Sequence, residues 1–408
     1  MKLQSVCTLI EDSEHKTAPR ATKGYPSIRT PNIGKGRLKL EGVFLVSKET
    51  YVKWTRRAIP QANDLILARE APVGNVAIIP DNITPCLGQR TVLIRPDADK
   101  IHPHFLCYYL LSDEIQNKMT GMSSGATVAH LNLKDIRELE LTFIPKRKTQ
   151  ERIVSILSNY DSLIENNQRR INLLEQAAQN IYKEWFVNMR FPGHDKIAVD
   201  KETGLPKGWE QKELGEIISK LESGSRPKGG VDNSLKVGVP SIGAESIRGL
   251  GYFDYTKTKY IKRDFFLQMN KGHLKHKDIL IYKDGAYIGR STLFQDDFPF
   301  KECSINEHVF LVHASNEQLQ YYLYFTLNSK VYFEKMQNLN SNAAQPGINQ
   351  SKIKTLTIHI PAEELLVQFD KLVSPFVKQI YVLAKENLRL KQARDILLPR
   401  LMNQTIKV

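Results

Sequence analysis

The chain has 408 residues, of which 41% are hydrophobic and 25% charged; this suits two to four globular domains and excludes wholesale disorder. Its 58 Lys and Arg against 44 Asp and Glu give a formal net charge of +14, which favours a polyanionic partner such as nucleic acid. The four cysteines form no Cys-x-x-Cys pair, no apolar run is long enough to cross a bilayer, and the N-terminus lacks an apolar signal-peptide core. Disulfide-stabilised, zinc-cluster and membrane proteins are therefore excluded, and we expect a cytoplasmic protein.

The same short motifs occur twice along the chain, in the same order. The matched pairs are Tyr25–Ile28 with Val239–Ile242, Asp64–Glu70 with Asp278–Asp284, and Asn132–Ile136 with Asn349–Ile353. The first two pairs are separated by the same length of chain, and the separation of the third is nearly the same. Repeats of this length are whole domains, so the sequence predicts a tandem duplication with pseudo-two-fold symmetry.

Each half begins with short β-type runs that are separated by Gly, Pro and Asn turns. We therefore predict the α+β fold class, with two globular domains. The predicted boundaries are 1–145 for the first domain, 207–360 for the second, and 191–206 for a polar linker punctuated by Pro and Gly.

A long helix is predicted after each domain, over residues 146–190 and 361–403. Apolar residues recur there at alternating steps of four and three, which is the spacing of a coiled-coil seam. If a two-fold axis perpendicular to the helices relates the two halves, the two helices must run in opposite directions. We therefore expect an antiparallel two-helix coiled coil. The apolar seam positions are Ile153, Leu157, Ile164, Ile171, Leu174, Ile181 and Trp185 in the first helix, and Phe369, Phe376, Ile380, Leu383, Leu390, Leu397 and Leu401 in the second.

One polar residue interrupts each seam, Asn167 in the first and Asn387 in the second. A buried asparagine at such a position costs stability and fixes the register, whereas one at the edge of the seam is solvated. Both alternatives stay open at this point. Pro375 lies within the second seam, where it should kink the helix or mark its actual start.

No catalytic motif occurs in the sequence. It has no Gly-x-x-x-x-Gly-Lys-Ser/Thr phosphate loop, no complete Gly-x-Gly-x-x-Gly, no Asn-Pro-Pro-Tyr/Phe of amino-methyltransferases and no His-Glu-x-x-His. We therefore expect a non-catalytic binding protein that itself holds no metal and no cofactor.

Several segments resemble the specificity subunits of type I restriction–modification systems. They are Gln150–Leu157, Glu184–Phe186 with Arg190–His194 after it, Gly204–Trp209, and Leu397–Met402. The resemblance covers essentially the whole chain, and its most specific part is the Trp-Phe…Phe-Pro-Gly-His passage that leads into Leu-Pro-Lys-Gly-Trp.

This resemblance implies two target-recognition domains, each of which reads one half of a bipartite double-stranded DNA site, with a coiled coil that fixes the spacer between the halves. It also implies two methyltransferase (modification) subunits that dock on the coil with S-adenosylmethionine, and ATP-dependent restriction subunits that can join them with ATP and Mg²⁺. The two domains differ strongly in sequence, so we expect an asymmetric target. The first half lacks a counterpart of Leu205–Trp209, which leaves open how its first strand packs.

Candidate DNA contacts are basic residues in loops rich in glycine or aromatic residues. Cations near phosphates supply affinity independent of sequence, and a few side chains that reach base edges supply specificity. The predicted contacts are Arg29, Lys35, Arg37, Arg69 and Arg90 in the first domain, and Arg226, Lys228, Arg248, Lys257, Lys283 and Arg290 in the second. Two other functions stay open: an interaction scaffold with incidental basic faces, and a self-contained restriction–modification enzyme, which the missing motifs disfavour.

Overall fold

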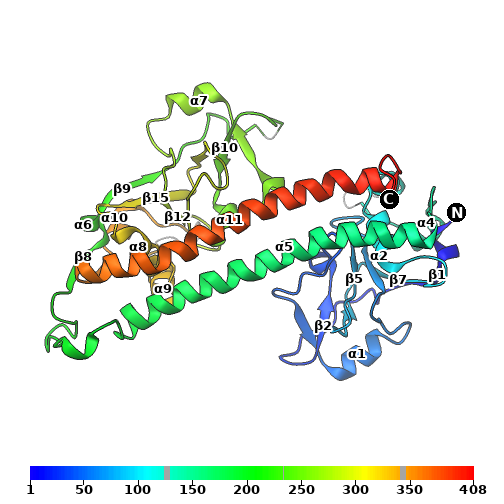
Figure 1. Cartoon of the computed structure of the whole chain (residues 1–408), viewed down its shortest axis with the longest axis horizontal. Helices are drawn as coiled ribbons and strands as arrows, with labels where there is room; N and C mark the ends of the chain where they lie inside the picture. Colours follow the sequence, from blue (N-terminus) through cyan, green and yellow to red (C-terminus); the bar gives the residue numbers. More distant parts are fainter. Residues whose placement is uncertain (124–128, 233, 341–345) are drawn as a thin grey trace. The chain divides into compact units, whose positions relative to one another are not determined.

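The computed structural model describes residues 1–123, 129–232, 234–340 and 346–408 (Figure 1). The chain divides into two compact units. Unit 1 comprises Met1–Ser162 and Leu390–Val408, and unit 2 comprises Leu163–Arg389. Within the described ranges, no helix is both long enough and apolar enough to cross a membrane.

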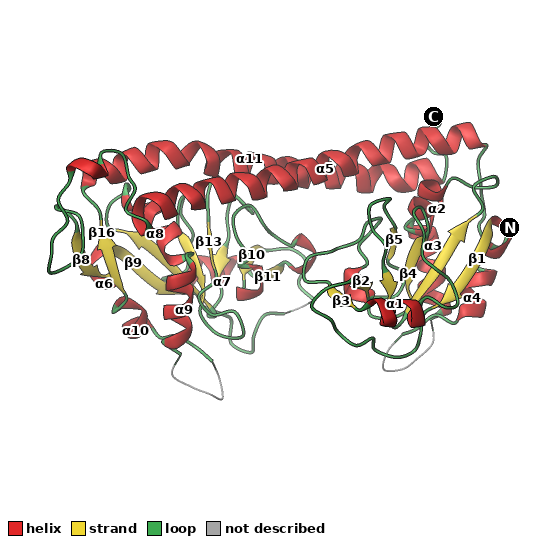
Figure 2. Ribbon diagram, turned by 90° about the horizontal axis from the view of Figure 1, so that it is seen from below, coloured by secondary structure: helices red, strands yellow, loops and turns green. Residues whose placement is uncertain are grey.

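Unit 1 contains a four-stranded antiparallel sheet in the order β1-β7-β4-β5 and a three-stranded sheet in the order β3-β2-β6 (Figure 2). The strands of the larger sheet are β1 (Cys7–Asp12), β4 (Leu65–Ala68), β5 (Val76–Ile78) and β7 (Thr91–Pro96). Those of the smaller sheet are β2 (Tyr25–Ile28), β3 (Phe44–Val46) and β6 (Cys86–Leu87). All four side chains of β4 are buried, as expected for a continuous apolar run at the centre of a sheet.

Unit 2 repeats this topology strand for strand, with sheets ordered β9-β15-β12-β13 and β11-β10-β14. Their strands are β9 (Ile218–Ser223), β12 (Ile279–Tyr282), β13 (Ser291–Leu293), β15 (Val309–Ala314), β10 (Val239–Ile242), β11 (Lys259–Ile261) and β14 (Ser304–Ile305). In both small sheets the central strand pairs antiparallel with one neighbour and parallel with the other. The predicted α+β class and tandem duplication are thus confirmed.

Short helices pack beside these sheets. Unit 1 has α1 (Lys48–Trp54), α2 (Pro103–Leu110), α3 (Asp113–Met122) and α4 (Leu133–Glu138). Unit 2 has α6 (Leu214–Ile217), α7 (Arg263–Gln268), α8 (Leu319–Leu327), α9 (Lys330–Asn338) and α10 (Gln350–Lys354), and a two-stranded sheet of β8 (Glu210–Glu213) and β16 (Thr357–Ile360). Single 3-10 turns lie at Leu3–Val6, Thr30–Asn32, His194–Lys196, Ala244–Ser246 and Tyr255–Lys257.

Two long helices, α5 (Arg147–Tyr182) and α11 (Glu363–Met402), contribute to both units. In unit 1, Ile153 near the start of α5 shares an apolar core with Leu401 near the end of α11. In unit 2, the Asn387 side-chain amide donates a hydrogen bond to the Ile164 carbonyl (3.3 Å). Farther along α5, the apolar core contains residues that precede Asn387 in α11, such as Phe369. Within each unit the two helix segments are therefore antiparallel, as predicted (Figure 2).

The predicted seam positions all lie on the inner sides of these helices. Ile153, Leu157, Ile171, Phe369, Ile380, Leu383 and Leu401 are buried, and Ile164, Leu174, Ile181, Trp185, Phe376, Leu390 and Leu397 are half-buried. Asn167 and Asn387 are only 4% and 5% exposed, so the buried alternative is the correct one. The Asn167 amide nitrogen and the Asn387 amide oxygen have no partner among the described residues. Buried polar groups without partners cost stability, so the apolar contacts of the seam, rather than these amides, stabilise the pairing.

The structure settles two points about where the long helices begin and end. Pro375 does not mark the start of the second helix, because α11 begins at Glu363 and continues through it. The first α-helix does not extend to residue 190, because it ends at Tyr182 and a π-helical turn follows. The wider turn brings the consecutive residues Trp185 and Phe186 against the same ring of Phe369, with centroids 6.0 and 4.9 Å away.

The first strand packs without a counterpart of Leu205–Trp209. The Met1 amino group donates to the Leu141 carbonyl (3.0 Å), and the Leu3 N–H donates to the Leu139 carbonyl (2.8 Å). Leu3 is fully buried. A single bridge from Lys2 to Glu140 thus replaces the β8–β16 pair of unit 2.

Candidate nucleic-acid interface

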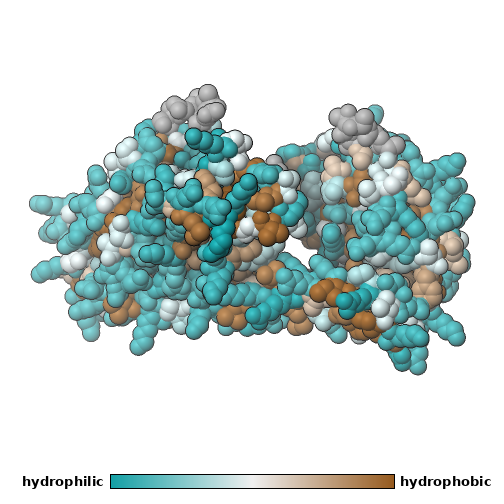
Figure 3. All heavy atoms as spheres, turned by 90° about the horizontal axis from the view of Figure 1, so that it is seen from above, coloured by the Kyte–Doolittle hydropathy of each residue, from teal (hydrophilic) through white to brown (hydrophobic). Residues whose placement is uncertain are grey.

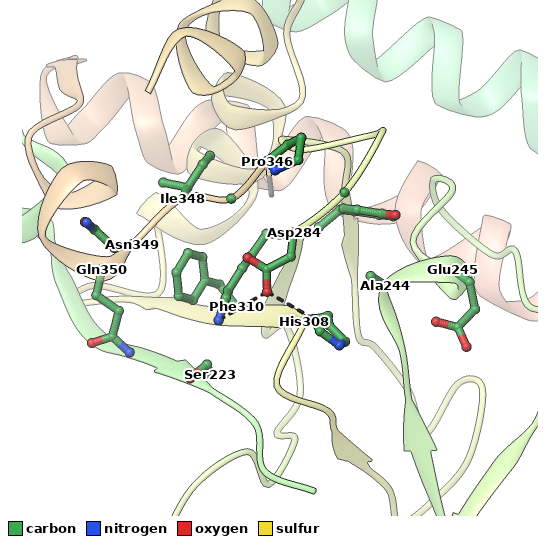
Figure 4. A pocket seen from close by; sticks show the side chains of 14 residues that line it. Ser223, Ala244, Glu245, Asp284, His308, Phe310, Pro346, Ile348, Asn349 and Gln350 are labelled. Atoms are coloured by element: carbon green, nitrogen blue, oxygen red, sulfur yellow. Dashed lines mark hydrogen bonds and ion pairs between the residues drawn. The ribbon is translucent and has the colours of Figure 1, made fainter. Parts of the chain in front are cut away.

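An open cleft of about 960 Å³ lies in unit 2 where β12 ends (Figure 4). The Asp284 carboxylate lies within it, with Oδ2 3.1 Å from His308 Nδ1 and 3.4 Å from Lys283 Nζ. Further polar side chains line the cleft: Ser223, Glu245, Tyr282, Asn349 and Gln350. The cleft therefore combines hydrogen-bond donors and acceptors of the kinds that distinguish base edges in DNA.

One carboxylate of this cleft, that of Glu245, is held ionised by a neighbouring cation. Glu245 lies 2.9 Å from the Lys259 ammonium. Burial acts to raise the pKa of the Glu245 carboxyl, but the hydrogen bond and charge of Lys259 outweigh it and hold this pKa below its ordinary value. Glu307, beside the cleft, lies 3.1 Å from Arg226 and 3.4 Å from His308. The rim of unit 2 is thus a network of paired charges.

Unit 1 has an ion pair at the equivalent place. The Arg69 N–H donates to the Arg90 carbonyl (2.9 Å), just as the Lys283 N–H donates to the His308 carbonyl (3.1 Å). This backbone bond makes Arg90 the counterpart of His308. The Arg90 guanidinium lies 2.9 Å from Glu70, which follows Arg69 as Asp284 follows Lys283. The two units therefore place a basic side chain and a carboxylate together at the same point, with different residues.

Two arginines of unit 1 stack on one aromatic ring. The guanidinium carbon of Arg20 lies 3.4 Å from the centroid of the Phe44 ring, and that of Arg29 lies 4.0 Å from it. Neither guanidinium makes a hydrogen bond or an ion pair with a described residue, and Arg29 Nε is buried without a partner. Arg56 and Arg57 of the same unit are, in contrast, paired with Glu14 and Asp12. Arg20 and Arg29 are thus available to a ligand.

The other predicted contacts of unit 1 have different surroundings. Arg69 is not a free cation: its side chain is 13% exposed, donates to the Leu131 carbonyl (2.7 Å) and pairs with Asp12 (3.3 Å). It joins β4 to β1, which is a structural role. Arg90 is 56% exposed, Lys35 is exposed, and Arg37 is half-buried.

In unit 2, most of the predicted contacts are held by a neighbour. Arg290 stacks on Tyr287 at 3.7 Å, Arg248 donates to the Tyr252 hydroxyl (3.0 Å), and Lys283 lies over Phe310. Arg226 pairs with Glu307 (3.1 Å) and Lys257 with Asp254 (3.9 Å). These two residues and Lys228 are exposed. The structure brings Lys283 and Arg226 to the rim of the cleft and does not bring all six residues together.

Several residues of these sites were missed in the sequence. Arg20 and Phe44 lie outside any glycine-rich loop, and their stacking depends on the pairing of β2 with β3. Glu245, Asp284 and His308 were overlooked because only cations were considered. The repeat itself was the available signal for Asp284, since it ends the motif Asp278–Asp284 as Glu70 ends the matching motif Asp64–Glu70.

Outward-facing residues of the long helices include large apolar side chains. Leu163 and Leu173 in α5 are 48% and 57% exposed, and Val367, Leu372 and Val382 in α11 are exposed as well. The visible surface is otherwise mainly hydrophilic, with small apolar patches among the polar side chains (Figure 3). These side chains are apolar surface on helices that the chain itself leaves uncovered.

The thiols offer no reactive group. Cys7, Cys86, Cys107 and Cys303 are free, and burial raises the pKa of the Cys7 and Cys107 thiols to about 12 and that of Cys86 to about 11. These thiols are therefore protonated and poorly nucleophilic at neutral pH. The described residues contain no group of three or more His, Cys, Asp or Glu that could hold a metal ion.

Comparison with known proteins identifies related chains. The family model for the type I restriction modification DNA specificity domain matches residues 1–176 and 206–392. The type I restriction enzyme MjaIX specificity subunit of Methanocaldococcus jannaschii is 28% identical over 386 residues, covering 89% of this chain and 82% of that protein. The HindI specificity subunit of Haemophilus influenzae is 23% identical and covers 94% of this chain and 95% of that protein.

A solved structure has the same fold. The type I restriction–modification S subunit from M. genitalium superimposes with a TM-score of 0.55 and 16% identity, covering 98% of this chain and 95% of that one. The family match spans both halves of the duplication and leaves out residues 177–205 and 393–408. The chain therefore belongs to the type I restriction–modification DNA specificity family and is a DNA sequence-recognition subunit.

Proposed function

We propose that the chain reads a bipartite and asymmetric DNA target, with unit 1 at one half-site and unit 2 at the other. The observation that carries this proposal is the duplicated site. Glu70 and Arg90 in unit 1 occupy the places of Asp284 and His308 in unit 2. Equivalent positions with different hydrogen-bonding groups favour equivalent docking on DNA and different base preferences.

The antiparallel segments of α5 and α11 are proposed to set the spacer between the half-sites. An α-helix rises about 1.5 Å per residue, so the 36 residues of α5 correspond to about 54 Å. One turn of DNA is about 34 Å, and half-sites one turn apart face the same side of the duplex. A helix that is lengthened or shortened by one turn should therefore change the spacer and leave both half-sites unchanged.

Two modification subunits are proposed to dock on the long helices. The predicted seam residues are buried or half-buried on the inner sides of the helices, so they support docking by keeping the helices paired. The exposed apolar residues, among them Leu163 and Leu173, are the ones that a partner can cover. In this proposal the complex is cytoplasmic, and the partners carry S-adenosylmethionine, ATP and Mg²⁺, while this chain binds none of them.

A genome-wide map of adenine methylation tests the proposed function. Cells that express the modification subunits with and without this chain are compared, and the expected difference is one gapped motif with two unlike halves. A map that is the same in both cells would contradict the proposal. Methyl transfer by the purified chain alone would instead support a self-contained enzyme.

Binding of the assembled complex to duplex DNA separates recognition from an incidental basic surface. Phosphate contacts make affinity fall steeply with salt, and base contacts make it depend on sequence. We expect both dependences. A complex with neither would support the scaffold function.

A further inference from the structure

We infer that unit 1 reads a guanine in its half-site through Arg29, with Phe44 and Arg20 holding the guanidinium in place; this inference rests on the proposed function. Arginine recognises guanine through two parallel hydrogen bonds, to O6 and N7 in the major groove. That recognition requires a planar guanidinium with fixed orientation and free N–H groups. The surroundings of Arg29 supply both conditions.

Phe44 fixes the orientation of Arg29. The guanidinium carbon lies 4.0 Å from the ring centroid, which is stacking distance. A guanidinium held over the ring loses this contact when it moves away, so the contact limits the directions in which its N–H groups can point. Flexible lysines or freely exposed arginines suit phosphate contacts better, because a phosphate accepts a cation from many directions.

The positive charges of Arg20 and Arg29 on the Phe44 ring are not neutralised by any described residue. Arg20 lies 3.4 Å from the same centroid, so two positive charges share one ring. Neither has a carboxylate partner among the described residues, and mutual repulsion disfavours such a pair unless an electron-rich group binds beside it. Arg29 Nε is buried and has no partner, so a ligand cannot reach it. The donors of this side chain that a ligand can reach are therefore its two terminal nitrogens. The site is therefore incomplete without a ligand that offers acceptors.

Backbone packing also places Arg29. Gly88, which follows β6, lies against it: a Cβ atom at residue 88 would be 2.5 Å from Arg29 Cγ and 3.0 Å from the Ile28 carbonyl oxygen. Arg29, Phe44, Gly88 and Gln89 line a small pocket together. Gly88 thus leaves room for the side chain in its stacked position and acts as a positioning residue.

Unit 2 has no such stack at the equivalent place. Ser27 pairs with Phe44 in unit 1, and the matching Ser241 pairs with Lys259 in unit 2. Lys259 is an ion-pair partner of Glu245 rather than a platform for an arginine. The guanine reader is therefore assigned to unit 1 alone, which makes the two half-sites unlike at this position.

Selection from duplexes with randomised sequence, by the complete complex of this chain with its modification subunits, tests the inference. The main variant is Arg29→Lys, which keeps the positive charge and loses the planar pair of donors. Discrimination at one G·C position of one half-site should fall by roughly ten- to a hundred-fold, with every other position unchanged. Phe44→Leu keeps both arginines and should weaken discrimination at the same position.

The matched control is Arg56→Lys, an exposed arginine of the same unit that is paired with Glu14 at 2.9 Å. It should leave the selected motif unchanged. Full discrimination by Arg29→Lys would overturn the inference, and so would a loss at an A·T position or in both half-sites. Selection of no motif by the unchanged complex would overturn the proposed function as well, so the two failures are distinguishable.

Discussion

The two units build the same framework and differ in the side chains that they place on it. In unit 1, β3 contributes Phe44, whose ring contacts the unpaired Arg20 and Arg29. At the same place in unit 2, β11 contributes Lys259, which is paired with Glu245. The backbone pairing at these positions is the same. The fold thus depends on apolar strands that both halves retain, while the chemistry at the strand ends is free to differ, which is what reading two unlike half-sites requires.

The helix pair shows a second difference of this kind. Asp161 and Arg394 form an ion pair in unit 1 (2.7 Å), and the Tyr108 hydroxyl donates to the same carboxylate (2.6 Å). The constant offset between the two seams, which matches Ile153 with Phe369, places Val377 and Ala178 at the corresponding positions of unit 2. Both of these residues are fully buried. At this position the two helices are therefore held together by an ion pair in unit 1 and by apolar contacts in unit 2.

The largest expected effect comes from breaking this ion pair. Arg394→Ala leaves the Asp161 carboxylate buried without its cation, which should lower the free energy of unfolding of unit 1 by about 3 kcal/mol. Amide hydrogen exchange, followed separately in the two units, is the measurement. Unit 2 should keep its protection.

A triple variant sharpens the same comparison. Asp161→Val, Arg394→Ala and Tyr108→Phe together copy the apolar pair of unit 2 and remove the hydroxyl that would lose its acceptor. The stability of unit 1 should return to within about 1 kcal/mol of the original, because well-packed apolar residues replace buried ion pairs at little cost. A triple variant no more stable than Arg394→Ala would contradict this account of the pair.

Removal of one basic side chain from each duplicated site should weaken a different half-site. Arg90→Ala leaves Glu70 without its cation in unit 1, and His308→Ala removes a neighbour of Asp284 in unit 2. Each change should reduce affinity up to about tenfold, because Glu70 loses its cation and Asp284 keeps only Lys283, so the carboxylate repels nearby phosphates more strongly. Competition between duplexes altered in one half-site or the other measures the effect, with Arg147→Ala on α5 as the control. Equal losses at both half-sites would refute the assignment of one unit to each.

A smaller change should displace Arg29 without altering any charge. Gly88→Ala introduces a methyl group 2.5 Å from Arg29 Cγ, so the guanidinium must shift. Discrimination at the guanine position should fall several-fold in the selection experiment. Gly121→Ala is the matched control, since a Cβ there meets no atom within 4 Å. An unchanged motif with Gly88→Ala would show that the position of Arg29 does not matter.

The smallest predicted effect concerns a buried carboxyl of unit 2. Burial raises the pKa of Glu175, and hydrogen bonds from the Leu250 N–H and the Tyr324 hydroxyl offset this only in part. The same offset between the seams places the exposed Lys391 at this position in unit 1. The stability that the neutral carboxyl gives is therefore present below the pKa of the unfolded chain, about 4.3, and is lost as pH rises through the raised folded pKa.

Glu175→Gln removes this dependence. The variant should match the original protein at pH 4 and be more stable at pH 7, as measured by urea unfolding at both pH values. The exposed Glu151→Gln serves as the control and should show no such gain. A variant that is less stable at pH 7 would contradict the predicted sign.

Much of the fold was predictable because it depends on periodic apolar residues. The seams from Ile153 to Trp185 and from Phe369 to Leu401 indicated two antiparallel helices, and the constant offset between the repeats indicated the duplication. The family membership followed from motifs around Trp185 and Trp209. Of the two alternatives for Pro375, the structure excludes a helix start there, because tertiary packing along the helix outweighs the cost of one missing hydrogen bond.

Individual contact residues were less predictable, because their availability depends on pairing in three dimensions. Arg69 looked like a recognition residue until Asp12, far earlier in the chain, proved to be its partner. Arg20 looked unremarkable until the strand pairing placed it on Phe44. A basic residue can be predicted to contact DNA only after the structure shows which carboxylates and aromatic rings it already contacts within the protein.

The most direct test of the central claim is a methylation map of cells that carry the complex with Arg29→Ala or with Glu245→Gln, beside the original chain. Two separate readers predict a gapped motif with unlike halves, in which the first variant relaxes one half and the second variant relaxes only the other. A palindromic motif, or a change in both halves from either single substitution, would contradict the claim that each unit reads its own half-site.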